Sequence, residues 1–209
     1  MKPIKSLLVL AIMLAPGLVA AQGYYGSGPG YYNQPNRIPG GFHDRTGRLA
    51  FGASFGLGGM HDQGSGITSC DNCANAPAFE IDGHIGGMIT PRFALLFEAQ
   101  ANGRTVHSDV LNGDTVMTQT AAMLAGQFWI TPQLWVKAGI GVSQIQLDDA
   151  YGTYGQRGTG GALMGAVGFE LMSARFFAVD LQGRLIEGGY DSLNDNITAA
   201  TVGIGINWY

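Results

Sequence analysis

The stretch FWITPQLWVKAGIG, residues 128–141, places a lysine, Lys137, in the middle of an otherwise apolar run. An earlier stretch, MITPRFALLFEAQ, residues 88–100, places Glu98 in the same way after the same Ile-Thr-Pro sequence. Because the side chains of a β-strand alternate between two faces, each charge points away from its apolar neighbours. Both stretches therefore predict strands that follow tight turns and that have one apolar and one polar face.

This alternation recurs along most of the chain after residue 47. It predicts eight strands, at residues 48–59, 78–88, 93–104, 117–129, 134–143, 162–171, 177–185 and 198–208. Three connections are tight turns, at residues 89–92, 130–133 and 172–175, and four are longer and polar, at residues 60–77, 105–116, 146–161 and 188–196. Strands of about ten residues, joined in this way, predict an all-β, eight-stranded antiparallel up-and-down barrel.

The distribution of charge predicts which face of the barrel is outside. One face of nearly every strand carries no charge, and the other mixes all the charges with small and polar residues. A water-facing surface would be about 25–35% charged, whereas the whole chain is only 12% charged. We therefore expect a transmembrane barrel with its apolar face toward lipid and its polar face inside. The expected ion network in the lumen comprises Glu80, Asp82, His84, Glu98, Arg104, Lys137, Glu170, Asp180 and Arg184.

The ions of the lumen must pair with one another, because unpaired burial costs several kcal/mol per ion. We expect them to fill the interior as a plug, since eight strands leave no open channel. Two other barrels stay open as alternatives at this point. One is a narrow pore, and the other is a soluble lipocalin-like ligand binder with its apolar face inside.

The first 46 residues of the 209-residue chain differ from the barrel in composition. Residues 1–21 have two early lysines, a short apolar run and a small-residue cleavage site, which together predict a signal peptide. Residues 22–46 are rich in Gly, Tyr and Pro, and we expect a flexible periplasmic segment there. The barrel would then occupy residues 47–209.

Aromatic residues gather beside the predicted short turns and at the end of the chain, as in an interface girdle of a membrane barrel. They are Phe93, Phe128, Trp129, Trp135, Phe169, Phe176, Phe177, Trp208 and Tyr209.

With these residues, the chain resembles the small outer-membrane β-barrel proteins of Gram-negative bacteria, of the OmpA transmembrane-domain and OmpX/Ail type. The resemblance spans residues 48–209, and its most specific element is the end of the chain, VGIGINWY. This end looks like the family's C-terminal assembly signal, which implies that the barrel-assembly machinery reads it. Asn207 departs from the pattern, which would have an aromatic or apolar residue there. The signal would rest on Gly203, Gly205, Ile206, Trp208 and Tyr209.

Two other motifs suggest chemistry outside the lumen. Cys70 and Cys73 lie in the first long loop, and two cysteines in an exported chain most simply form a disulfide. Metal binding with His61 and a redox role are the alternatives. An enzyme that modifies lipid stays open as an alternative because of His107, Ser108 and Asp109, although side chains adjacent along a strand or loop point apart, which disfavours a nucleophile–base pair.

We therefore expect a monomeric, non-enzymatic protein of the outer membrane with a structural or surface-interaction role. Its partners would be outer-membrane lipid and the assembly machinery. The loops carry no recognisable motif, so a surface ligand is not specified. A net charge of −4 gives no footprint for nucleic acid, and we expect neither a bound metal nor a cofactor.

Overall fold

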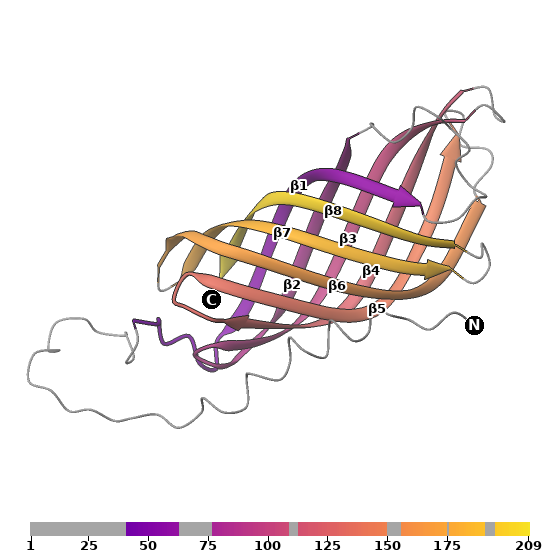
Figure 1. The fold of residues 1–209 in the computed structure, drawn as a ribbon. Helices are drawn as coiled ribbons and strands as arrows, with labels where there is room; N and C mark the ends of the chain where they lie inside the picture. Colours follow the sequence, from indigo (N-terminus) through magenta and orange to yellow (C-terminus); the bar gives the residue numbers. More distant parts are fainter. Residues whose placement is uncertain (1–40, 63–76, 109–112, 150–155, 175, 191–194) are drawn as a thin grey trace, which may run out of the picture. The chain divides into compact units, whose positions relative to one another are not determined.

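A computed structural model describes residues 41–62, 77–108, 113–149, 156–174, 176–190 and 195–209. Eight strands in these ranges form one closed barrel in which each strand pairs with its neighbours in the sequence (Figure 1). The strands are β1 (Leu49–Asp62), β2 (Ala78–Thr90), β3 (Phe93–Ser108), β4 (Gly113–Trp129), β5 (Leu134–Asp149), β6 (Gln156–Ser173), β7 (Phe177–Tyr190) and β8 (Asp195–Trp208).

All eight pairings are antiparallel, and the barrel closes where β1 pairs with β8 from Phe51↔Trp208 to Asp62↔Ile197. The register slips beside two of the short turns, between Met88 and Thr90 and between Glu170 and Met172. The predicted eight-stranded up-and-down topology is confirmed. Among the described residues, no helix is long and apolar enough to span a membrane.

Several strands extend beyond their predicted ends, mostly on the side of the long connections, while β2 and β6 each run two residues further at a short turn. The β3–β4 ladder continues to Ser108↔Gly113, and β5 reaches Asp149, where the sequence predicted loops. On β5 the first outward position beyond the predicted end is the polar Gln144. The backbone ladder continues although the apolar alternation that revealed the strand has stopped.

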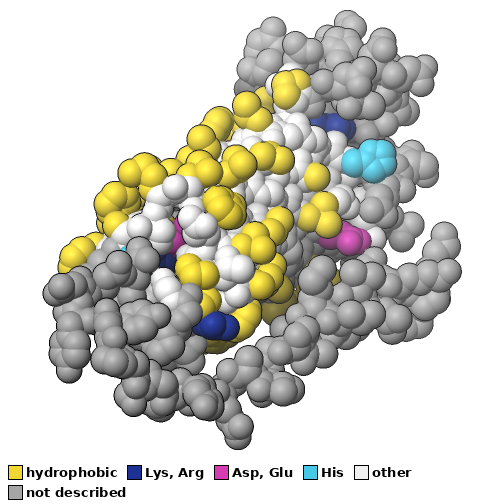
Figure 2. Space-filling model, turned by 60° about the vertical axis from the view of Figure 1, so that its left-hand side comes forward, with side chains coloured by type: hydrophobic (Ala, Val, Ile, Leu, Met, Phe, Trp, Pro, Cys, Tyr) yellow, Lys and Arg dark blue, Asp and Glu magenta, His cyan; other side chains and the backbone are white. Residues whose placement is uncertain are grey.

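The predicted assignment of the two faces is confirmed. Phe97, Ile140 and Leu181 are 54%, 64% and 46% exposed, whereas Glu98, Lys137 and Asp180 are 0%, 4% and 1% exposed. Figure 2 shows apolar side chains spread over this side of the barrel, with few charged ones between them. The ions are therefore inside the barrel and the large aliphatic and aromatic side chains are on its outer wall.

The interior is not polar throughout, which corrects the prediction of a polar lumen. Near the loop ends of the strands it is filled by buried apolar side chains, among them Met60, Met117, Ile145, Ile186 and Ile197. Because an eight-stranded barrel has room only for side chains, the positions away from the ions pack as an ordinary core. In a barrel this narrow, an apolar residue can therefore occupy an inward position as well as an outward one.

Candidate functional site

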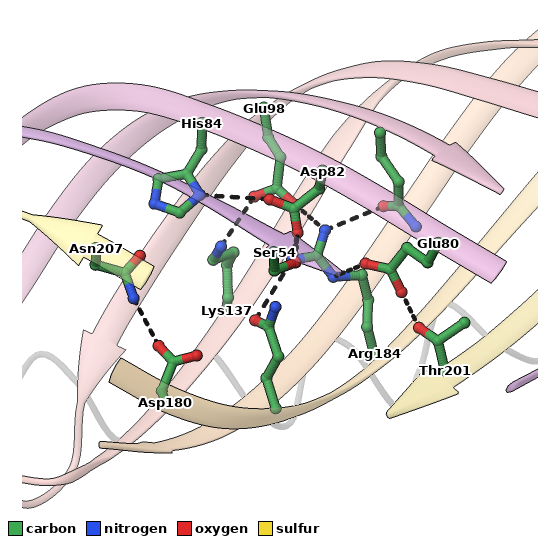
Figure 3. Close-up of polar contacts among 12 residues, drawn as sticks. Ser54, Glu80, Asp82, His84, Glu98, Lys137, Asp180, Arg184, Thr201 and Asn207 are labelled. Carbon is green, nitrogen blue, oxygen red and sulfur yellow. Dashed lines mark hydrogen bonds and ion pairs between the residues drawn. The ribbon is translucent and has the colours of Figure 1, made fainter. Parts of the chain in front are cut away.

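The centre of the lumen is organised around Arg184, which β7 projects toward β2 and β3 (Figure 3). Its Nε lies 3.1 Å from Glu80 Oε1, and its two terminal nitrogens form ion pairs with Asp82 and Glu98. All four side chains are buried. A guanidinium has five N–H donors in a fixed planar arrangement, so one arginine can serve three carboxylates at once.

Lys137 enters the same cluster from β5. Its Nζ lies 3.0 Å from Glu98 Oε2, so Glu98 is shared between Lys137 and Arg184. The ammonium also lies over the ring of Trp135, 5.3 Å from its centroid. These contacts replace the water that both ions lose on burial. The predicted pairing of Lys137 and Arg184 with lumen carboxylates is present in the structure.

Hydroxyl and amide groups complete the central cluster, and the sequence analysis missed them. Ser54 donates to Asp82, and Thr201 donates to Glu80. Gln100 accepts a hydrogen bond of 3.3 Å from Arg184. Such residues are common in strands of every kind, and only their inward position in the alternation could have revealed them.

The central cluster contains more acid than base. Three carboxylates, on Glu80, Asp82 and Glu98, face the two cations Lys137 and Arg184. His84 adjoins them, with its Nδ1 3.5 Å from Asp82 Oδ1. His84 therefore belongs to the network as predicted, beside the carboxylates and mostly buried.

Asp180 is held by neutral donors near the turn end of the barrel. Asn207 Nδ2 donates to it over 2.7 Å, and the indole Nε1 of Trp135 donates over 3.2 Å. This explains Asn207, which departs from the apolar pattern of the chain end. Its side chain points into the lumen, and the outward positions of β8 are Val202, Ile204, Ile206 and Trp208.

Glu170 lies at the turn-end mouth and pairs with a residue that the sequence analysis placed outside the barrel. Arg45 donates from Nη1 to Glu170 Oε1 over 3.0 Å and from Nη2 to Oε2 over 3.3 Å. The indole Nε1 of Trp129 donates to the same carboxylate over 2.8 Å. Arg45 was predicted to be part of a flexible segment, residues 22–46, but it is 3% exposed. The barrel therefore includes residues 41–46, and its boundary lies before residue 47.

Arg104 is buried near the loop end, where it donates to the backbone carbonyl of Met60 on β1. Together these contacts assign every predicted ion to the interior, in three places: the central cluster, the turn-end mouth and the loop end. Such an arrangement can fill the lumen and stabilise the barrel by contacts between its strands.

The predicted aromatic girdle needs a correction. Trp129 and Trp135 are buried, and their indoles donate to Glu170 and Asp180 inside the barrel. Trp208 faces outward and stacks on Phe51 across the closing seam, with ring centroids 5.4 Å apart. A tryptophan beside a turn fits either face, because its ring is apolar and its N–H needs an acceptor when it is buried.

Cys70, Cys73 and Asp109 lie outside the described residues, and the side chain of His107 is not described either. Within the described ranges, no group of three or more His, Cys, Asp or Glu residues could hold a metal ion. The disulfide thus stays a prediction.

Comparison with known proteins supports the fold. No protein-family model matches the chain. A search of curated proteins also finds no match. Among solved structures, the attachment invasion locus protein Ail of Yersinia pestis, in complex with the heparin analogue sucrose octasulfate, is similar with 13% identity and a TM-score of 0.53. The match covers 76% of this chain and 98% of Ail.

Two further structures are similar to the same degree. Neisserial surface protein A is 12% identical with a TM-score of 0.54, over 77% of this chain and 96% of that protein. The outer membrane protein OprG of Pseudomonas aeruginosa is 13% identical with a TM-score of 0.50, over 78% and 96%. The chain therefore has the fold of small eight-stranded outer-membrane barrels, as its resemblance to that class implied.

Proposed function

We propose that the protein is an outer-membrane β-barrel with a structural or surface-interaction role. Its strands would cross the bilayer, with the short turns in the periplasm and the four long connections at the cell surface. One observation carries this proposal: every strand exposes a large apolar side chain, while the ions are inside. Exposed examples, one from each strand in order, are Phe55, Ile81, Phe97, Leu124, Ile140, Val167, Leu185 and Ile204.

An apolar belt of this extent fits lipid and not water, because soluble monomers rarely expose large contiguous apolar patches. Its borders also fit a bilayer. Toward the loops, polar side chains enter the outward positions of β4 and β5, as at Thr120 and Gln144. Toward the turns lie two half-buried arginines, Arg48 over the ring of Phe176 and Arg92 over that of Phe42. Arginine and aromatic side chains suit the headgroup region.

Fractionation of cells tests this location. We expect the protein in the membrane fraction, released only by detergent, and with heat-modifiable migration on gels. Release without detergent would contradict the proposal and favour a soluble ligand binder.

The interior supports a plugged barrel in preference to a narrow pore. Arg184, Lys137 and their three carboxylates occupy the middle of the lumen, and apolar side chains fill the loop end. We expect no steady conductance from the purified protein in planar bilayers. Single-channel steps that persist at several voltages would instead support the pore.

We also propose that the protein is not an enzyme. Mass spectrometry of lipid A, from cells with and without the protein, should then give identical spectra. A mass change that depends on the protein would overturn this proposal and direct attention to His107 and its neighbours.

Export and assembly follow from the proposed location. We propose that residues 1–21 are removed, that Cys70 and Cys73 form a disulfide, and that the barrel-assembly machinery inserts the protein as a monomer. N-terminal sequencing of the mature protein should begin at Gln22. Intact mass before and after reduction and alkylation would report the state of the two cysteines.

A further inference from the structure

The segment Gly41–Arg48, here called the strap, lies across the turn-end mouth of the barrel. It touches all three short turns. A Cβ added to Gly41 would lie 3.6 Å from Cγ of Pro132, in the β4–β5 turn. The ring of Phe42 lies 4.0 Å from the guanidinium of Arg92, in the β2–β3 turn. Arg45 donates to the carbonyl of Ala174, in the β6–β7 turn.

Glycines near both ends of the strap allow this path. Gly41 and Gly47 have φ values of +80° and +72°, in the left-handed region where a side chain is strained. Between them the strap is packed, since Phe42 and Arg45 are both buried. The backbone N–H of Gly47 bonds the carbonyl of Met88 over 2.8 Å, and this bond fixes the strap to β2 just before β1 begins.

The guanidinium of Arg45 occupies a site built by parts of the chain that are far apart in the sequence. Glu170 and Ser173 come from β6, Trp129 from the end of β4, and Tyr209 from the end of the chain. The guanidinium carbon lies 3.7 Å from the centroid of the Tyr209 ring, and the Tyr209 hydroxyl is 3.5 Å from Glu170 Oε1. Burial raises the pKa of the Tyr209 phenol well above its ordinary value, so the hydroxyl keeps its proton.

The seam between β1 and β8 is thus held from both sides. Outside, Phe51 stacks on Trp208. Inside, Arg45 stacks on Tyr209, the residue that follows Trp208. This seam joins the first strand to the last, so it closes the longest loop of the eight pairings. The entropic cost of forming it is therefore the largest, and contacts that link its two strands stabilise it the most.

We propose that the strap is a latch that docks after the barrel has closed and then holds β1 against β8. The order follows from the construction of the site, because Tyr209 reaches the mouth only when β8 is in place. Until then the Arg45 guanidinium lacks part of its site. Once docked, the strap opposes opening of the seam, because the contacts of Arg45 hold the start of β1 against β6 and against the end of the chain. The inference rests on the closed barrel and not on the proposed location.

Hydrogen exchange of the full-length protein in detergent tests the latch. Arg45→Ala should raise exchange of the seam amides in β1 and β8 by about tenfold or more, with little change in β4 and β5, since the lost contacts govern opening at the seam. Lys137→Ala is the matched control, because it also removes a cation from a buried carboxylate, but that pair joins β5 to β3. Its increase should centre on those strands.

Two results would overturn the proposal. One is unchanged seam exchange in Arg45→Ala, and the other is an equal rise in all eight strands, which would make Arg45 a general stabiliser. If Arg45→Ala does not fold, Arg45→Lys replaces it as the test variant. It keeps the charge, so exchange of the seam amides should rise by less than the tenfold expected for Arg45→Ala, and only at the seam.

Pulse labelling during refolding tests the order independently. The Gly47 amide should become protected after the seam amides, and earlier protection would contradict the latch.

Discussion

The indole ring of Trp135 occupies the space in which a side chain at Gly168 would begin. The two residues face each other across the β5–β6 ladder. The absence of a side chain at Gly168 leaves room for the ring, whose N–H reaches Asp180 on β7. A glycine that adds nothing to the apolar pattern thus decides where a tryptophan of the lumen sits.

Gly168→Ala should therefore displace the Trp135 ring. We expect a loss of roughly 1–3 kcal/mol in the free energy of unfolding, as for other overpacked interiors, and a change in tryptophan emission. Gly165→Ala is the control on the same strand, because a Cβ there meets nothing within 4 Å. Equal behaviour of the two variants in urea titrations would show that the ring is not held against Gly168.

Lys137→Ala should destabilise the barrel by leaving Glu98 with one cation fewer. Breaking a buried ion pair from one side costs about 3–5 kcal/mol, and heat-modifiable migration should shift to a lower temperature. Adding Glu98→Gln to Lys137→Ala should recover part of the loss, because it removes the buried charge that has lost one of its two cations. Unchanged heat resistance of Lys137→Ala would count against the network.

Leu95→Arg should impair membrane insertion by about 2–4 kcal/mol if this outward position lies near the middle of the bilayer. Leu95 is exposed on β3 within the apolar belt. Thr120→Arg provides the comparison, since Thr120 is also exposed but lies toward the loops, and its effect should be small. Similar assembly of both variants in liposomes would mean that the belt does not face lipid.

Asn207→Leu would give the end of the chain the apolar residue that the family pattern expects, and yet it should destabilise the protein. It removes one of the two donors to Asp180, and the loss of a hydrogen bond to a buried carboxylate costs about 1–3 kcal/mol. Trp208→Phe keeps an aromatic outside and should be close to neutral. A gain in stability on Asn207→Leu, measured in urea, would show that Asp180 does not depend on this amide.

Much of the fold is encoded locally. Glu98 between Phe97 and Ala99, and Lys137 between Val136 and Ala138, fix the two faces of their strands, because a strand can place neighbours only on opposite sides. The short turns after β2 and β4 were predictable for a similar reason, since Pro91 and Pro132 cannot donate to a ladder. The long connections were less predictable, because the β4–β5 pairing continues past Gln144 to Asp149, after the apolar signal of β5 ends.

Partners in the lumen could be predicted as a class but not as pairs. That Arg184 would meet carboxylates followed from the cost of burying an ion alone. That it serves Glu80, Asp82 and Glu98 together depends on where the curved wall brings β7 opposite β2 and β3.

By itself the sequence determined the alternation, and with it the eight strands, the closed topology and the placement of ions inside. Only the tertiary structure decided that Arg45 belongs to the barrel and that Trp129 and Trp135 face inward. The reason is physical: alternation is a property of neighbours along one strand, whereas the site of Arg45 is made by residues up to 164 positions away in the sequence, at Tyr209. Nothing near Arg45 in the sequence indicates that contact, which exists only once the last strand has met the first.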